Sequence, residues 1–209
     1  MEITASAQWI NATFAGFDQT VTSAVHGLYN AAGGFFTPFF EFISLLGKGG
    51  IFLILLSLCL MFCKPTRRFG TAMLLGVTIG AIITNLCLKV FIARPRPYAD
   101  QSSLFYQLWL LVGQNLESDK SFPSGHTTAA FACMTPVLIM GKPKYKILAL
   151  CFALLMGIAR IYLVVHFPSD VLAGMIVGIV AGCLAVVIAS KLPRSWYQWD
   201  ALAKGKEKL

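Results

Sequence analysis

The chain has 209 residues, of which 57% are hydrophobic and only 12% are charged. Because a soluble domain carries roughly 25% charged residues, this composition argues against a water-soluble domain and indicates a protein embedded in lipid. The formal net charge of +8 would by itself suit a nucleic-acid partner, but the placement of the basic residues along the chain argues against one.

Residues 1–34 are expected to form an amphipathic helix that lies in the headgroup layer of a membrane. The apolar residues of this segment recur at three- and four-residue steps, which places them on one face of a helix: Ile10, Phe14, Phe17, Val21, Val25 and Leu28. His26 is predicted to be a surface histidine on this helix.

Five apolar stretches follow, which we interpret as membrane spans because a bilayer core of roughly 30 Å takes about 20 helical residues. They lie within residues 35–63 and at about 69–92, 125–140, 145–164 and 169–190. The predicted fold is all-α: a polytopic membrane helical bundle with five transmembrane helices. It forms one membrane domain over residues 35–192, followed by a basic cytoplasmic tail at 193–209.

The first stretch, residues 35–63, is too long for one straight crossing. A glycine cluster with one lysine, Gly47-Lys48-Gly49-Gly50, lies in its middle and predicts a kink. We expect residues 35–46 to be interfacial or tilted and residues 50–63 to lie deeper in the membrane. The alternative is that they form two separate spans, for a total of six.

The basic residues divide between the two ends of this bundle. Eleven follow the first span, join the third and fourth, or follow the fifth: Lys64, Arg67, Arg68, Lys142, Lys144, Lys146, Lys191, Arg194, Lys204, Lys206 and Lys208. Six fall at the other end: Lys48, Lys89, Arg94, Arg96, Lys120 and Arg160. By the positive-inside rule the end with eleven is cytoplasmic. We therefore expect a multi-pass cell-membrane protein with its N-terminus outside and no nucleic-acid partner.

Three segments bring ionisable residues to the outer end of the bundle. The second span ends in LKVFIARPRP, the third begins with PSGH, and the fourth ends in ARIYLVVHFPSD. Together they carry three cations, two histidines, a carboxylate and a Ser-Gly pair: Lys89, Arg96, Arg160, His126, His166, Asp170, Ser124 and Gly125. Seven residues separate Lys89 from Arg96, about two helical turns, so both side chains can point the same way. We expect these residues to share one outer pocket.

These residue types suit a phosphate ligand. Arginine matches phosphate oxygens with two hydrogen bonds and lysine adds a point charge. The third and fifth spans, which open at Pro123 and Pro168, add positive helix N-termini. Asp170 can accept a hydrogen bond from one nitrogen of His166, which leaves the other nitrogen free as a nucleophile. Since no carboxylate cluster is available for magnesium or calcium, we expect phosphoryl transfer with no metal and no cofactor.

The spacing of these residues forms three motifs: Lys89-x6-Arg96-Pro97, Pro123-Ser124-Gly125-His126, and Arg160-x5-His166-x3-Asp170. Together they resemble the three-part signature of the type 2 phosphatidic acid phosphatase superfamily, which includes lipid phosphate phosphatases, glucose-6-phosphatase and the vanadium haloperoxidases. The helical layout extends the resemblance to about residues 35–190. One position departs from the pattern, because Ala159 stands where the third motif usually has serine; this removes a hydroxyl but no catalytic group.

The resemblance implies a role for each motif residue. His166 would attack phosphorus and form a phosphohistidine, Asp170 would orient it, and His126 would protonate the leaving oxygen and later activate water. The phosphoryl oxygens would be held by Lys89, Arg96, Ser124, Gly125 and Arg160. The basic residues outside the motifs are expected to make surface or headgroup contacts at most: Arg94, Lys48 and Lys120.

The expected function is that of an integral membrane phosphatase, which removes the terminal phosphate from a lipid phosphate or diphosphate at the outer face. Undecaprenyl diphosphate, phosphatidylglycerol phosphate and phosphatidic acid are candidate substrates. One alternative is a lipid phosphotransferase, which passes the phosphoryl group to an acceptor other than water. Another is an anion transporter, since buried cations also line anion paths. His166 with Asp170 separates the two classes, because a transporter needs the cations but no oriented nucleophile.

Overall fold

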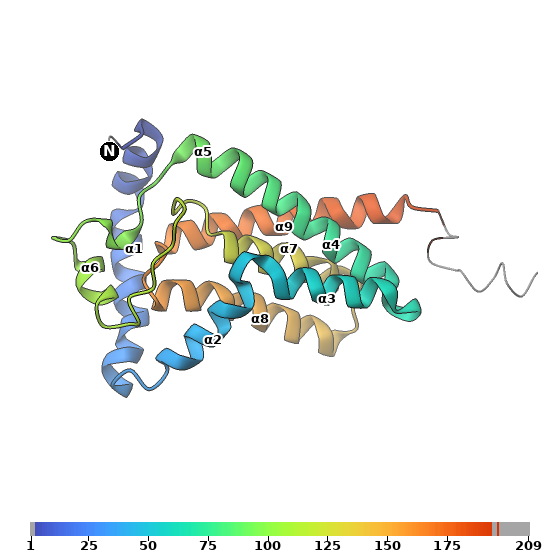
Figure 1. Ribbon diagram of the computed structural model, residues 1–209, viewed down its shortest axis with the longest axis horizontal. Coiled ribbons are helices and arrows are strands. Elements are labelled where there is room, and N and C mark those ends of the chain that lie inside the picture. Colours follow the sequence, from blue (N-terminus) through green and yellow to red (C-terminus); the bar gives the residue numbers. More distant parts are fainter. Residues whose placement is uncertain (1–2, 194–195, 197–209) are drawn as a thin grey trace, which may run out of the picture.

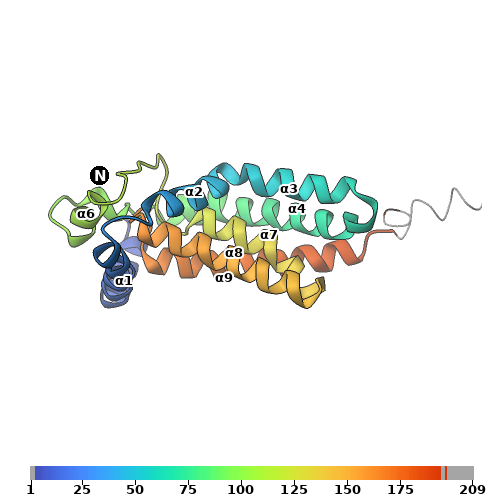
Figure 2. The same cartoon turned by 90° about the horizontal axis from the view of Figure 1, so that it is seen from below.

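The computed structural model describes residues 3–193 and Trp196, and within these residues every regular element is helical. The helices are α1 (Ala5–Ala32), α2 (Thr37–Gly47), α3 (Ile51–Phe62), α4 (Arg67–Ala81), α5 (Lys89–Ile92), α6 (Leu104–Trp109), α7 (Gly125–Met140), α8 (Pro143–Tyr162) and α9 (Pro168–Ser190). Five of them, α3, α4, α7, α8 and α9, run along the long axis, and α1 lies across one end (Figures 1 and 2). The predicted all-α bundle is confirmed. The predicted basic tail, apart from Pro193 and Trp196, lies outside the described residues.

Four helical segments are long and apolar enough to cross a membrane: Thr37–Phe62, Lys64–Ala99, Pro143–Tyr162 and Pro168–Ser190. The remaining predicted span, the third, corresponds to α7, which is apolar but only 16 residues long. Large apolar side chains remain on the surface of the bundle, among them Phe62 at 72%, Leu86 at 69% and Phe91 at 74% exposure. A surface of this kind suits lipid, so the chain is a multi-pass membrane protein.

The glycine cluster breaks the first span into two helices, as predicted. A 3-10 turn, Lys48–Gly50, joins α2 to α3, and Gly49 and Gly50 have φ angles of 61° and 69°. A residue with a Cβ atom adopts these angles only with strain, so glycine is required at this turn. Gly47, at the end of α2, is also closely packed, because a Cβ there would lie 2.5 Å from the His126 ring. The kink therefore brings the end of α2 against the first histidine of the motifs.

The second span is interrupted before its motif residues. A π-helical turn, Ile82–Leu88, joins α4 to α5, and such turns are frequent at functional sites. The helix then ends at Ile92, and Ala93 has a φ of 50°. Lys89 lies on the last helical turn, whereas Arg96 lies on the extended segment that follows. The prediction that a shared helix would align these two residues was wrong, since the chain leaves the helix between them.

Helices α7 and α9 approach each other so closely that their backbones touch. Three glycines of α9 at four-residue spacing, Gly174, Gly178 and Gly182, face α7. A Cβ on them would lie 2.7 Å from the Ser124 carbonyl oxygen, 2.6 Å from Phe131 Cβ and 2.5 Å from Thr135 Cβ, respectively. Small residues permit such approach between membrane helices. This packing holds the N-termini of α7 and α9 side by side at the same end of the bundle.

Helix α1 turns a polar face toward the bundle. Asp18, Thr22 and His26 are each 1% exposed, whereas Trp9 on another face is 65% exposed. The prediction of His26 as a surface histidine was wrong: its Nε2 lies 3.1 Å from the carbonyl oxygen of Tyr162, and the two rings stack. Burial lowers the pKa of His26. Polar side chains face inward here because α1 covers helix ends and loops rather than apolar helix sides.

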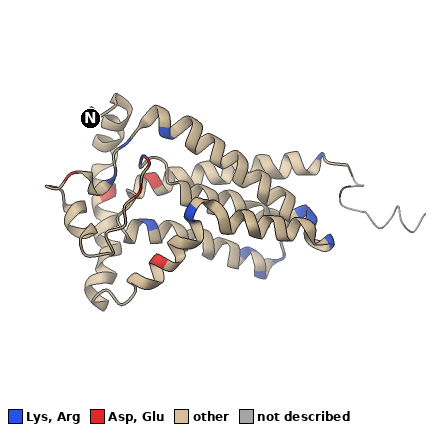
Figure 3. Ribbon diagram, in the orientation of Figure 1, with Lys and Arg blue, Asp and Glu red and all other residues tan. Residues whose placement is uncertain are grey.

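Charge differs between the two ends of the bundle (Figure 3). We call the end covered by α1 the motif end, because it carries the three motifs, and the opposite end the basic end. Among the described residues, the acidic side chains lie toward the motif end. The charged residues described at the basic end are all lysine or arginine, and they lie at the α3–α4 connection, at the α7–α8 connection and at the end of α9.

Candidate active site

Lys89 and Arg96 meet one carboxylate, that of Asp119 in the loop that precedes α7. Lys89 Nζ contacts Asp119 Oδ2 and Arg96 Nη2 contacts Asp119 Oδ1 in close ion pairs. Arg96 Nε also donates to the Asp119 backbone oxygen at 3.0 Å. Although partial burial raises it, the contacts with Lys89 and Arg96 hold the pKa of Asp119 below its ordinary value. A single ionised carboxylate therefore bridges the two cations.

Arg160 pairs with a second carboxylate from the same loop. It lies in the last turn of α8, 2% exposed, and its guanidinium contacts the Glu117 carboxylate and the Ser44 hydroxyl of α2. The loop thus supplies one carboxylate to the Lys89 and Arg96 pair and a second one to Arg160. No motif marks Glu117 or Asp119; the sequence signal available was only that acidic residues precede the PSGH segment.

His166 follows α8 and is 2% exposed. Its Nε2 lies 2.9 Å from Arg96 Nη1, which also donates to the Val165 carbonyl oxygen at 2.6 Å. A guanidinium only donates hydrogen bonds, so Nε2 must be the acceptor and the ring proton must sit on Nδ1. Burial, followed by the charges of Arg96, Arg160 and Lys89, lowers the pKa of His166 well below its ordinary value. The ring is neutral, with the lone pair of Nε2 on the side of the cations.

Asp170 lies in the first turn of α9 and is fully buried. Its Oδ2 accepts hydrogen bonds from Ser121 Oγ at 2.5 Å and from the Phe167 backbone N–H at 3.0 Å. The same oxygen faces His166 Nδ1 at 3.6 Å, which is longer than a normal hydrogen bond. Ser121 Oγ is 3.5 Å from that nitrogen. Asp170 is therefore placed beside the protonated nitrogen of His166, and Ser121, which sequence reasoning missed, lies next to both.

The PSGH segment forms the N-terminus of α7. Ser124 is the N-cap residue, and its hydroxyl accepts from Thr127 Oγ1 at 2.9 Å and from the Thr127 N–H at 3.4 Å. Its own backbone N–H donates to the Asp170 carbonyl oxygen at 3.0 Å. A Cβ on Gly125 would lie 3.6 Å from Lys89 Nζ. The turn therefore sits directly beside Lys89, while the Ser124 side chain is occupied within the cap.

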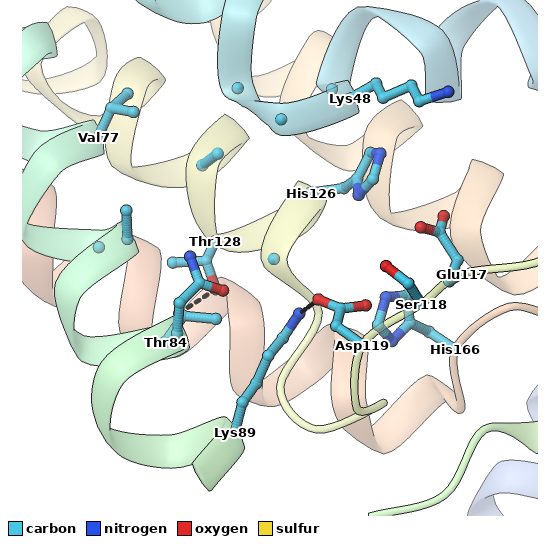
Figure 4. Close-up of a pocket in the computed structure, with 18 of the residues that line it drawn as sticks. Lys48, Val77, Thr84, Lys89, Glu117, Ser118, Asp119, His126, Thr128 and His166 are labelled. Atoms are coloured by element: carbon cyan, nitrogen blue, oxygen red, sulfur yellow. Dashed lines mark hydrogen bonds and ion pairs between the residues drawn. The ribbon is translucent and has the colours of Figure 1, made fainter.

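A cavity of about 340 Å³ lies among these groups, with Lys89, Arg96, Gly125, His126 and His166 in its wall. Asp119 reaches into it from its loop toward Lys89, with His126 and His166 bordering the same space (Figure 4). Arg160 lines a smaller recess of about 140 Å³ that shares Glu117 and His126 with the cavity. Five of the predicted site residues thus share the cavity, whereas Arg160 lines the adjoining recess and Ser124 and Asp170 are not among the wall residues.

The other basic residues have different surroundings. Lys48 is exposed but contributes to the cavity wall, and Lys120 is half-buried. Arg94 was predicted to be a surface contact at most, and this was wrong: it is 1% exposed and forms ion pairs with Asp18 and Asp170. The sequence could not show this, since Asp18 belongs to a helix 76 residues away.

Among the described residues, no group of three or more histidine, cysteine, aspartate or glutamate side chains is arranged to hold a metal ion. The arrangement instead offers an accepting imidazole nitrogen, two cations and a second imidazole around a space large enough for a phosphate, with a third cation, Arg160, in the adjoining recess.

Comparison with known proteins places this geometry in context. A model of the PAP2 superfamily matches residues 69–194. An undecaprenyl-diphosphatase of Sulfolobus acidocaldarius is 31% identical over 73% of this chain and 70% of its own length. Phosphatidylglycerophosphatase B of Bacillus subtilis is 37% identical over 54% of each chain. The crystal structure of a transmembrane PAP2 type phosphatidylglycerolphosphate phosphatase from Bacillus subtilis is similar with a TM-score of 0.66 and 28% identity, covering 90% of this chain and 92% of that one.

Proposed function

This chain belongs to the PAP2 superfamily, and we propose that it is a membrane phosphatase that removes the terminal phosphate from a lipid phosphate or lipid diphosphate. The observation that carries the proposal is the protonation state of the His166 ring, in which Nε2 is unprotonated. Its Nε2 accepts from Arg96 at 2.9 Å, so a nucleophilic lone pair is directed at a cation that can also bind the phosphate. A site that only binds or conducts anions has no need of this tautomer.

The phosphoryl group of the substrate takes the place of the loop carboxylates. Lys89 and Arg96 then bind phosphoryl oxygens in place of Asp119, and Arg160 binds in place of Glu117. Phosphate is a good substitute because arginine binds its oxygens as it binds those of a carboxylate. The backbone at Gly125, at the N-terminus of α7, adds a positive helix end beside Lys89.

Phosphoryl transfer then proceeds in two steps. Nε2 of His166 forms a bond to phosphorus while the bond from phosphorus to the leaving oxygen breaks, and His126 gives that oxygen its proton. Asp170 supports the positive charge that develops on the His166 ring. In the second step His126 takes a proton from water, the water oxygen bonds to phosphorus, and His166 is released together with inorganic phosphate.

The walls of the cavity support a lipid substrate. Beside its charged residues, the cavity is bordered by the glycine turn at Lys48–Gly50, by Ile54 of α3, and by Val77 and Ala81 of α4. Helix α3 exposes large apolar side chains beside the cavity, with Ile51 at 62% and Leu55 at 59% exposure, so a headgroup can enter while its chain stays on an apolar surface. Similarity to an undecaprenyl-diphosphatase and to a phosphatidylglycerophosphatase supports undecaprenyl diphosphate and phosphatidylglycerol phosphate as candidate substrates of this chain. Phosphatidic acid is a third candidate.

The charge distribution supports a cell-membrane location with the site outside. Among the described residues, the charged residues at the end opposite the site are all lysine or arginine (Figure 3), and such an end is retained on the cytoplasmic side. The motif end, with α1 lying across it, then faces the extracytoplasmic side.

Release of phosphate by the purified protein from a panel of lipid monophosphates and diphosphates tests the proposed function. We expect hydrolysis of at least one lipid, with the label of a radioactive terminal phosphate trapped on His166. His166→Ala should remove both signals. Transfer of the label to an added alcohol in preference to water would favour the phosphotransferase. Anion flux through vesicles that persists in His166→Ala, without hydrolysis by the wild type, would favour the transporter.

A further inference from the structure

A buried cluster of charges lies behind the cavity, on the side of Asp170 that faces away from His166. At its centre is Arg94, whose Nη1 donates to Asp170 Oδ1 at 2.6 Å and whose Nη2 donates to Asp18 Oδ2 at 2.9 Å. The exposures of the three side chains are 1%, 0% and 2% for Arg94, Asp170 and Asp18. Neither Asp18 nor Arg94 is part of the cavity wall; both line a neighbouring groove beside α1.

Each of the three nitrogens of the Arg94 guanidinium donates at least one hydrogen bond to another side chain. Nε donates to Asn11 Oδ1 at 2.7 Å, and Nη1 also donates to Ser169 Oγ at 2.8 Å. The Phe167 ring covers the guanidinium, 3.8 Å from its central carbon. An arginine held by hydrogen bonds in its plane and by a ring on its face has little freedom to rotate, so Asp170 Oδ1 is bound to a rigid group.

Asp18 is attached independently to the helix turn that carries Asp170. Its Oδ1 accepts from the Ser169 backbone N–H at 2.7 Å, and its Oδ2 accepts from Ser169 Oγ at 2.8 Å. The first N–H groups of a helix have no partner within the helix. A carboxylate from α1 therefore caps the first turn of α9 and at the same time holds Arg94 against that turn.

We propose that Asp18 and Arg94 are positioning residues that hold the Asp170 carboxylate beside His166, so that helix α1 is an integral part of the active site. This inference rests on the proposed function. With Oδ1 bound to Arg94 and Oδ2 bound to Ser121 and Phe167, the carboxylate has one orientation, and Oδ2 faces His166 Nδ1. Asp18 holds the guanidinium from the side opposite Asp170. Because Asp18 neutralises part of the Arg94 charge, more of the negative charge of Asp170 remains available to stabilise a positive His166 ring.

Asp18→Asn tests the proposal with a change of charge and almost none of shape. An asparagine still offers one oxygen to the Ser169 N–H, but Arg94 loses its second anionic partner. Arg94 is then drawn to Asp170 alone, and Asp170 supports the His166 ring less. We expect kcat to fall on the order of 10-fold, the lower end of the loss that follows mutation of residues that orient metal-binding histidines in other proteins. KM should change little, because Lys89, Arg96 and Arg160 lie outside this cluster.

Two further variants distinguish a role of Asp18 in positioning Asp170 from a role that only anchors α1 to the bundle. His26→Ala loosens α1 at Tyr162 without touching the cluster, so it should lower the thermal unfolding temperature and leave kcat unchanged. Ser169→Ala keeps the charges but removes the hydroxyl shared by Asp18 and Arg94, so it should lower kcat several-fold in a folded protein. Ser169→Ala also serves if Asp18→Asn does not accumulate.

A double mutant supplies the decisive comparison. If Asp18 acts through Asp170, adding Asp18→Asn to Asp170→Asn should cause no further loss in single-turnover phosphoenzyme formation, because contacting residues of one network are not additive. The proposal is overturned if Asp18→Asn and Ser169→Ala both keep the wild-type kcat, or if the two losses multiply. Failure of the wild type to hydrolyse any lipid, or activity that persists in His166→Ala, would instead contradict the proposed function itself.

Discussion

The two sets of ion pairs around His166 differ in how far water reaches them. On the cavity side, the carboxylates of Asp119 and Glu117 are 49% and 27% exposed, although their cationic partners are buried. On the α1 side, Asp18, Arg94 and Asp170 are at most 2% exposed. A half-exposed carboxylate can leave its partner for water at little cost, whereas a buried one cannot. The first set is suited to exchange for a phosphate, and the second to permanent support.

The largest loss of activity is expected on mutation of His166, which lies between the two sets of ion pairs. His166→Ala removes the nucleophile and leaves the ion pairs on both sides intact. Loss of a nucleophile costs about 10⁶-fold in kcat in other enzymes, so phosphate release should fall to the background rate while thermal unfolding changes little. Retention of near-normal turnover would show that neither set of pairs supports His166 as proposed.

The contrast between exchangeable and permanent pairs is tested by removing one cation from each. Arg94→Ala leaves Asp18 and Asp170 buried without a counter-charge, which costs about 3–5 kcal/mol of stability. Lys89→Ala leaves Asp119 half exposed and still paired with Arg96, so it should cost at most about 1 kcal/mol. Thermal or chemical unfolding in detergent measures both. Equal losses of stability would remove the distinction between the two sets.

The Lys89→Ala protein should fail in catalysis instead. It lacks one of the charges that stabilise the transferred phosphoryl group, and loss of one such donor costs about 10²–10³-fold in kcat. A stable protein with this loss of turnover would place Lys89 on the substrate side of the site.

A smaller effect is expected when the exchangeable carboxylate is neutralised. Asp119→Asn removes a charged competitor for Lys89 and Arg96, and a pair whose carboxylate is half exposed is expected to contribute at most about 1 kcal/mol. KM and the inhibition constant of vanadate, a phosphate mimic, should each fall by up to about fivefold. Asp100→Asn is the matched control, since Asp100 is an exposed loop carboxylate bound to Ser102. An unchanged or raised KM in Asp119→Asn would contradict exchange.

The same variant carries a prediction for pH dependence. The pKa of His166 is lowered by burial and by the cations Arg96, Arg160 and Lys89, and Asp119 opposes them. Removing that negative charge makes the protonated ring less favourable, so the pKa falls further. The neutral nucleophile then persists to lower pH, and the acid limb of kcat/KM should move to lower pH than in the wild type on the same substrate. A shift to higher pH would contradict this arrangement of charges.

The smallest effect is expected from chelation. Because Lys89, Arg96 and Arg160 supply the positive charge, excess EDTA should leave the rate unchanged. A loss of activity on chelation that magnesium restores would show that a metal ion takes part.

Most of the fold could be predicted because the bilayer imposes strong rules on sequence. A span must be apolar over a set length, so α7, α8 and α9 were located within a few residues of their bounds, and the span predicted at 69–92 covers α4, the π-helical turn and α5 together. The kink at Gly47–Gly50 followed from glycine alone. The alignment of Lys89 with Arg96 was predicted for the wrong reason, since a helix was assumed to continue where Ala93 turns the chain out of it. The hydropathy pattern cannot reveal that a single residue such as Ala93 adopts a positive φ angle.

The sequence by itself determined which motif residues meet, because three motifs at the ends of neighbouring spans must share one end of a bundle. Only the tertiary structure decided which carboxylate neutralises which cation. Asp119 and Glu117 lie in a loop whose path no periodicity predicts, and Asp18 reaches Arg94 only because α1 turns its polar face onto the ends of the other helices. An ion pair depends on distance in space, and residues 76 positions apart come within reach only after the helices have packed.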